Sequence, residues 1–204
     1  MKKFIILILI FSGLTFYNFD KHTIEDYQVT EISQKGDYFC WAASLEGIFK
    51  YYQEIYPQEE IIKEYSRSFF LGNIDSPIYG YKPSVSRYFN NEKPHKYNKD
   101  FVRDGLLPDK GYESKIINKN DIISYVHKDI PILVFYNNHA SIIVGYIKVF
   151  DQLYIKIMDP RYSPSKQDLF SYHPIEHFKG AYDYDPYMGT KNLIMDVKFL
   201  AIYK

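Results

Sequence analysis

Apolar residues in the first half of the chain recur every three or four positions, which is the spacing of amphipathic helices. Over residues 41–52 this spacing predicts a helix with Cys40 at or near its first turn. A proline followed by two glutamates is typical of a helix start, and it predicts a second helix over 57–69. A third helix is expected over 118–128. The first part of the chain is therefore expected to be mainly helical.

The second half has a different pattern, with short runs rich in β-branched and aromatic residues that predict strands. These runs cover residues 131–136, 140–149, 153–158 and 193–203, with turn residues at 137–138 and 151–152. Before them, residues 70–118 contain closely spaced Gly and Pro, and we expect loops there with one short helix over 83–89. Helices followed by an antiparallel sheet predict an α+β fold, a single domain of two packed lobes.

The N-terminus has a pattern of its own. Two lysines after Met1 precede an apolar run that extends to about Tyr17, and the first acidic residue is Asp20. A short basic segment followed by an apolar stretch shorter than the ~20 residues of a membrane-spanning helix is typical of a secretory signal peptide. We therefore expect a signal peptide over 1–19 and a folded domain over 20–204. The domain would be secreted or periplasmic, and an uncleaved inner-membrane anchor is the alternative.

Composition and charge indicate a globular domain and argue against some classes of binding partner. The chain has 204 residues, of which 46% are hydrophobic, enough for one globular domain with a sizeable core. Its 25 basic and 25 acidic residues cancel. Because no net field attracts polyanions, we expect no nucleic-acid partner, and no membrane contact beyond the N-terminal segment. The sequence does not indicate an oligomeric state.

Cys40 is the only cysteine in the chain. Structural cysteines of exported proteins come in pairs, and a single one cannot form an internal bridge, so it is either buried and inert or retained for its reactivity. A position at a helix start stabilises a thiolate, and a nearby imidazolium lowers the thiol pKa further. Cys40 is therefore the candidate nucleophile.

Three other residues complete a candidate site. His139 opens a predicted strand and can serve as general base for the thiol. Asp159 ends the following strand, and a hairpin returns it to the same end of the sheet, where it can orient the imidazole; an Asp-Pro turn opener is the alternative. Gln34, six residues before Cys40, can donate its side-chain amide to an oxyanion together with the Cys40 N–H.

The other histidines make weaker candidates. His22, His95 and His127 lie in contexts that suggest no chemistry. His173 and His177 are four residues apart, a spacing that would put two metal ligands on one face of a helix. Pro174 and the lack of a convincing third ligand argue against that interpretation. We expect no metal and no organic cofactor.

Residues 34–46 and 131–160 resemble the papain-like cysteine peptidases. The resemblance lies in a Gln followed after five residues by Cys-Trp, in the strand that begins His139-Ala and continues to Gly145-Tyr146, and in a next strand that ends at Asp159. Papain has Asn as the last of these residues, and Asp159-Pro160 looks more like the bacterial branch, which includes double-glycine leader peptidases and papain-like effector proteases. The resemblance implies Cys40 as nucleophile, His139 as general base and acid, Asp159 as the orienting residue and Gln34 as oxyanion donor.

The resemblance implies hydrolysis of a peptide or protein substrate, with the pocket walls somewhere in residues 70–118. Two alternatives use the same fold. One is acyl transfer on the same residues by an amidase or a transglutaminase-like enzyme, since transglutaminases share the chain order Cys, His, Asp. The other is a catalytically silent binding module, against which the presence of all four residue types argues.

Overall fold

The computed structural model describes residues 4–10, 13–24, 32–35, 39–69, 101–136, 139–161, 170–179, 181–185, 190–195 and 197–204. The helices of this part are α1 (Cys40–Tyr51), α2 (Gln58–Phe69), η2 (Phe101–Leu106, a π-helix), α5 (Leu107–Asp109), η3 (Lys119–Asp121, 3-10), α6 (Ile122–Val126) and η4 (Ile175–His177, 3-10). The strands are β1 (Phe4–Ile10), β2 (Gly13–Thr23), β3 (Glu113–Ile117), β4 (Ile132–Tyr136), β5 (His139–Val149), β6 (Gln152–Met158), β7 (Phe170–Pro174), β8 (Ala181–Asp185), β9 (Thr190–Met195) and β10 (Lys198–Tyr203).

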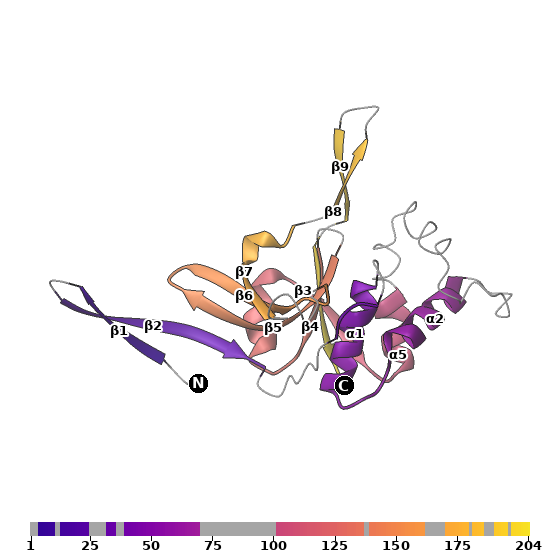
Figure 1. Ribbon diagram of the computed structural model, residues 1–204, viewed down its shortest axis with the longest axis horizontal. Coiled ribbons are helices and arrows are strands. Elements are labelled where there is room, and N and C mark those ends of the chain that lie inside the picture. The colour runs from indigo at the N-terminus through magenta and orange to yellow at the C-terminus, as the bar shows by residue number, and fades with distance from the viewer. Residues whose placement is uncertain are drawn as a thin grey trace.

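The main sheet has eight strands and is organised around β5. The path runs β1-β2-β5-β4-β10-β3, and β6 and then β7 extend from β5. All of these pairings are antiparallel. The first half of β5 pairs with β4 and its second half pairs with β2, while β6 pairs along most of its length. Helices α1, α2 and α5 lie together on one side of this sheet (Figure 1). The α+β class, with helices first and an antiparallel sheet after them, is confirmed.

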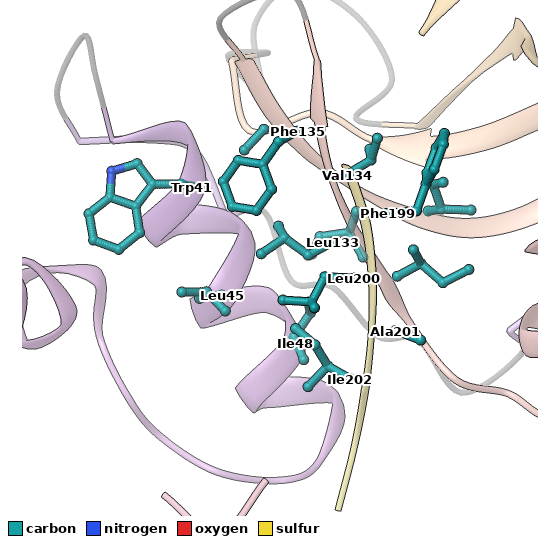
Figure 2. Close-up of a cluster of buried hydrophobic side chains, with 14 of the residues drawn as sticks. Trp41, Leu45, Ile48, Leu133, Val134, Phe135, Phe199, Leu200, Ala201 and Ile202 are labelled. Atoms are coloured by element: carbon teal, nitrogen blue, oxygen red, sulfur yellow. The ribbon is translucent and has the colours of Figure 1, made fainter. Parts of the chain in front are cut away.

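Helix α1 is held by the centre of the sheet. Ile48 lies close to Leu200 and Ile202 of β10 (Figure 2). The ring of Trp41 points away from the sheet and packs against Tyr65 of α2, with ring centroids 5.3 Å apart. The side chains of Leu133, Phe135, Leu200 and Ile202 lie on the side of β4 and β10 that faces α1, whereas those of Val134, Phe199 and Ala201 lie on the other side, and all seven are buried. Every residue of β4 is buried, which is typical of a strand covered on both faces, and α6 also contacts β4 and β5. The start of α1, where Cys40 lies, is therefore fixed against the most buried strands.

The close approach of β2 to β5 explains why residue 145 of β5 is a glycine. A Cβ atom at Gly145 would lie 2.7 Å from the carbonyl oxygen of His22 and 3.1 Å from Cα of Thr23, both on the β2 backbone. The register between β5 and β6 also shifts between Ile143 and Gly145. Glycine allows the two backbones to approach at this irregularity, where any other residue would push β2 away.

The helices follow the pattern closely. Helix α1 begins at Cys40 and α2 begins directly after Pro57 with two glutamates in its first turn, as predicted. The helix expected over 118–128 is present as η3 followed by α6, and Asn118 and Asp121 form a capping box at its start. The short helix expected over 83–89 lies outside the described residues.

Two expectations about the strands were wrong, and two further strands were missed. Residues 113–117, expected to be a loop, form β3, an edge strand with mostly polar, exposed positions that an apolar pattern does not reveal. The run 193–203 is not one strand, because β9 pairs with β8 in a separate two-stranded sheet while β10 joins the main sheet. Strand β7 and strand β8 were not predicted at all.

At the N-terminus, β1 and the first part of β2 pair as a hairpin, and the end of β2 continues onto β5. Within the described residues, the structure contains no helix that is both long enough and apolar enough to cross a membrane. The signal peptide over 1–19 stays a prediction.

Candidate active site

Cys40 is the first residue of α1, and only 2% of it is exposed. The N-cap residue, Phe39, gives the first turn no side-chain hydrogen bond. Because unsatisfied N–H groups carry the positive end of the helix dipole, the helix start places partial positive charge at the thiol. One turn later, Ser44 Oγ donates to the carbonyl oxygen of Ala140 at 3.4 Å. The start of α1 thus packs against the start of β5, beside His139.

Burial dominates the acidity of the thiol. It raises the pKa of Cys40 from 9.0 to about 11, although backbone hydrogen bonds from Ala140 and Trp41 and the charge of Arg161 act to lower it. The expectation of a lowered thiol pKa considered the helix start and an imidazolium but not this desolvation, which the sequence does not reveal. In this setting a thiolate forms readily only if a protonated imidazole lies next to it.

His139 and Asp159 form a short hydrogen bond. His139 is the first residue of β5, Asp159 directly follows β6, and the antiparallel pairing of the two strands brings both to one end of the sheet. The distance from His139 Nε2 to Asp159 Oδ1 is 2.6 Å, and His139 is 3% exposed. The expectation that the hairpin would bring these two side chains together agrees with this geometry.

The ionisation of Asp159 determines the tautomer of His139. Burial acts to raise the pKa of the Asp159 carboxyl, but the hydrogen bond from His139 and the backbone N–H of Arg161 outweigh it, and the pKa is lowered. An ionised carboxylate can only accept hydrogen bonds, so Nε2 of a neutral His139 carries the proton and Nδ1 carries the lone pair. Nδ1 is buried and makes no hydrogen bond in the described part of the structure. It is therefore the nitrogen that can accept the proton of a thiol.

Gln34 lies at the same end of the sheet. Its backbone N–H donates to the carbonyl oxygen of Pro160 at 2.9 Å, which links the segment before α1 to the residue after Asp159. The structure thus brings the segment that carries Gln34 to the residues around Asp159, as it brings Cys40 to the start of β5.

Gln58, which sequence reasoning did not single out, holds both neighbours of Gln34. It lies at the start of α2 and is 1% exposed. Its Oε1 accepts the backbone N–H of Lys35 at 2.9 Å, and its Nε2 donates to the carbonyl oxygen of Ser33 at 3.2 Å. The same Nε2 lies 3.1 Å from Oε2 of Glu46 on α1. A buried glutamine one residue after a helix-starting proline is not a recognisable motif, so no sequence pattern indicated its role.

Tyr136 packs against the imidazole of His139. The two rings meet edge to face with centroids 5.7 Å apart, and the residues are opposite each other in the register of β4 and β5. The hydroxyl of Tyr136 lies 3.3 Å from Oγ of Ser141, and burial raises the pKa of this tyrosine to about 12. Tyr136 is a second positioning residue, because it contacts the imidazole of His139. It was not singled out from the sequence because it lies in an apolar run that predicts only a strand.

The remaining histidines lie elsewhere or form no metal site. His22 Nε2 is 3.0 Å from Asp129 Oδ1, and His127 Nε2 is 2.6 Å from the hydroxyl of Tyr146, near the other end of β5. His173 is in β7 and His177 in η4, so the helical face considered for them does not exist, although their ring centroids are 4.5 Å apart. No group of three or more potential metal ligands occurs in the described ranges, and His95 lies outside them.

A family model described as the Peptidase_C39 like family matches residues 26–189, the greater part of the chain. The match includes Gln34, Cys40, His139 and Asp159. A search of curated proteins found no match.

Proposed function

The chain belongs to the Peptidase_C39 like family, a family of papain-like cysteine peptidases, and from this premise we propose that it hydrolyses peptide bonds with Cys40 as nucleophile. In this proposal His139 is the general base and acid, Asp159 orients His139, and Gln34 donates to the oxyanion. The substrate is a peptide or protein. The enzyme acts outside the cytoplasm, secreted or in the periplasm, as the N-terminal sequence suggests.

One observation carries the proposal. His139 donates Nε2–H to Asp159 at 2.6 Å, while its buried Nδ1 makes no hydrogen bond in the described part of the structure, next to the turn that holds Cys40. A structural histidine in a core normally satisfies both ring nitrogens, because an unsatisfied buried polar atom costs about 1–3 kcal/mol. The backbone of Ala140, the residue after His139, hydrogen-bonds the Cys40 thiol, so the unsatisfied nitrogen and the buried thiol belong to one site, as proton transfer requires.

The reaction proceeds in two halves. His139 Nδ1 takes the proton of Cys40, and the thiolate attacks the peptide carbonyl carbon to form a tetrahedral oxyanion. The backbone N–H of Cys40 and the side-chain amide of Gln34 donate to this oxyanion. His139 then gives its proton to the leaving amine, and a thioester remains on Cys40. Water, deprotonated by His139, hydrolyses the thioester and regenerates the thiol.

Asp159 contributes by holding the imidazole. Its lowered pKa keeps it ionised at neutral pH, so it stabilises the imidazolium that forms when Cys40 loses its proton. The charge of this imidazolium also stabilises the thiolate of Cys40, which offsets the burial that raises the pKa of the thiol. Burial disfavours the thiolate of Cys40, and the imidazolium of His139 favours it. Replacement of His139 is therefore expected to leave Cys40 protonated and unreactive.

A proteome-derived peptide library tests the proposal. The purified full-length chain is incubated with the library, and new peptide termini are identified by mass spectrometry. We expect new termini with the wild-type chain and none with Cys40→Ala. Incorporation of an added amine, or release of ammonia, without new termini would contradict peptide hydrolysis and favour acyl transfer on the same residues.

A further inference from the structure

Arg161 is a fixed and exposed cation at the edge of the candidate site. Its backbone N–H donates to Asp159 Oδ1 at 2.9 Å, the same oxygen that accepts from His139. The preceding residue, Pro160, is buried and accepts the backbone N–H of Gln34 at 2.9 Å. These two hydrogen bonds fix the Cα of Arg161 beside the candidate orienting and oxyanion residues, while Arg161 itself is exposed.

The guanidinium acts on the groups of the site. Burial is the main influence on Cys40, and it raises the thiol pKa, but the charge of Arg161 acts to lower it. The same charge acts to lower the pKa of Asp159 and of Tyr136. The two backbone hydrogen bonds described above hold the exposed Arg161 at the edge of the candidate site, from where its long side chain can reach a bound substrate.

Arg161 forms no ion pair with a carboxylate in the described part of the structure. The nearest acid in sequence, Asp159, already accepts from His139 and from the backbone N–H of Arg161. Other basic residues do have carboxylate partners, such as Lys35 with Glu59 on α2 and Lys110 with Glu64. A guanidinium offers a planar set of donors that matches a carboxylate with two parallel hydrogen bonds. Among the described residues, therefore, no carboxylate occupies the guanidinium group of Arg161, and it can bind an external anion.

We propose that Arg161 is a specificity-determining residue that binds a carboxylate of the substrate close to the scissile bond. The carboxylate belongs to an Asp or Glu side chain or to the free C-terminus of a short peptide. This inference rests on the proposed peptide hydrolysis, and it names the preferred substrates as peptides with an acidic group beside the cleaved bond.

Matched peptides measure the preference. Two peptides that contain a cleavage site found in the library differ only by Glu or Gln beside the scissile bond, and a second pair has a free or an amidated C-terminus. We expect kcat/KM to favour one carboxylate form roughly three- to tenfold, the range of an exposed, charge-assisted pair. The pair that shows the preference identifies the source of the carboxylate. The preference should decrease at ~1 M salt, because screening weakens it.

Variants of Arg161 separate recognition from general electrostatics. Arg161→Gln should remove the preference, Arg161→Lys should retain part of it, and Arg161→Glu should reverse it in favour of a Lys-containing peptide. Lys119→Gln changes the net charge equally at an exposed position in η3 and should leave the preference intact. A variant that lowers kcat/KM for charged and neutral peptides equally would show that Arg161 only stabilises the thiolate, and it would overturn the proposal.

A second readout does not depend on peptide hydrolysis. Iodoacetate and iodoacetamide alkylate Cys40 and differ in a carboxylate, so the ratio of their rates reports attraction of an anion to the site. We expect Arg161→Gln to lower this ratio roughly three- to tenfold and Lys119→Gln to leave it unchanged. If no peptide is cleaved but the ratio depends on Arg161, the proposed hydrolysis fails and the carboxylate site stands. If peptides are cleaved with no charge preference, the hydrolysis stands and the role of Arg161 fails.

Discussion

At the scale of single residues, the candidate site combines a buried acid with a buried base. Burial alone keeps the proton on Cys40, since it raises the thiol pKa to about 11. His139 can remove that proton because Asp159 fixes its Nε2–H and stabilises the charge that His139 gains. Each member alone is unsuited to catalysis at neutral pH, and the pair depends on a geometry that other residues maintain.

Gln58 is one of those residues, and it can be tested with an isosteric change. Gln58→Glu keeps an acceptor for the Lys35 N–H but loses the donor to Ser33 and places a carboxylate beside Glu46. We expect a loss of about 1–3 kcal/mol in the free energy of unfolding, measured by urea denaturation, and a fall of kcat/KM beyond what unfolding explains.

Gln53→Glu makes the same charge change at an exposed position after α1 and serves as the control. Equal stability and activity of the two variants would contradict the positioning role of Gln58.

Asp159 gives a prediction about pH. Its pKa is lowered below 3.8 in the folded chain, so the stabilisation that it contributes is present above pH 3.8 and is lost as the pH falls through the folded pKa. Asp159→Asn removes this contribution. The difference in unfolding free energy between wild type and variant should be about 1–3 kcal/mol near neutral pH, and it should shrink as the pH falls below ~4. A difference that keeps growing below pH ~4 would contradict an ionised Asp159.

At the scale of elements, the position of the thiol depends on how α1 packs. Leu45 on α1 is fully buried in the apolar core, in the turn between Trp41 and Ile48 (Figure 2). Leu45→Ala leaves a cavity there, and we expect a loss of about 2–5 kcal/mol in the free energy of unfolding. In the same way, the pairing of β5 with β6 aligns His139 with Asp159.

Ile55→Ala is a matched control for Leu45→Ala, because Ile55 is 89% exposed in the connection between α1 and α2. Its effect should lie within about 0.5 kcal/mol. Similar losses for the two variants would mean that α1 is not anchored by this apolar face.

At the scale of the whole molecule, the sequence predicts the parts that periodicity and short motifs encode. Helices α1 and α2 could be located because their apolar residues recur every three or four positions, and strands β4 to β6 because runs of β-branched and aromatic residues alternate with turn residues. The hairpin expected from these runs predicted that His139 and Asp159 lie at the same end of the sheet. Strand β3 was missed because its exposed edge is polar, and the division between β9 and β10 was missed because one apolar run covers both. Gln58 and Tyr136 could not be found, since their roles depend on contacts between distant segments.

The rate of Cys40 alkylation by iodoacetamide as a function of pH, in wild type and in His139→Ala, tests the central claim most directly. We expect the wild-type inflection to lie below the ~8.5 of a free thiol, because the imidazolium stabilises the thiolate. Without His139 no imidazolium offsets the burial that raises the thiol pKa, and the inflection should move upward, above that of a free thiol. Coincident inflections in the two proteins would contradict the pairing of Cys40 with His139 and favour a binding module over an enzyme.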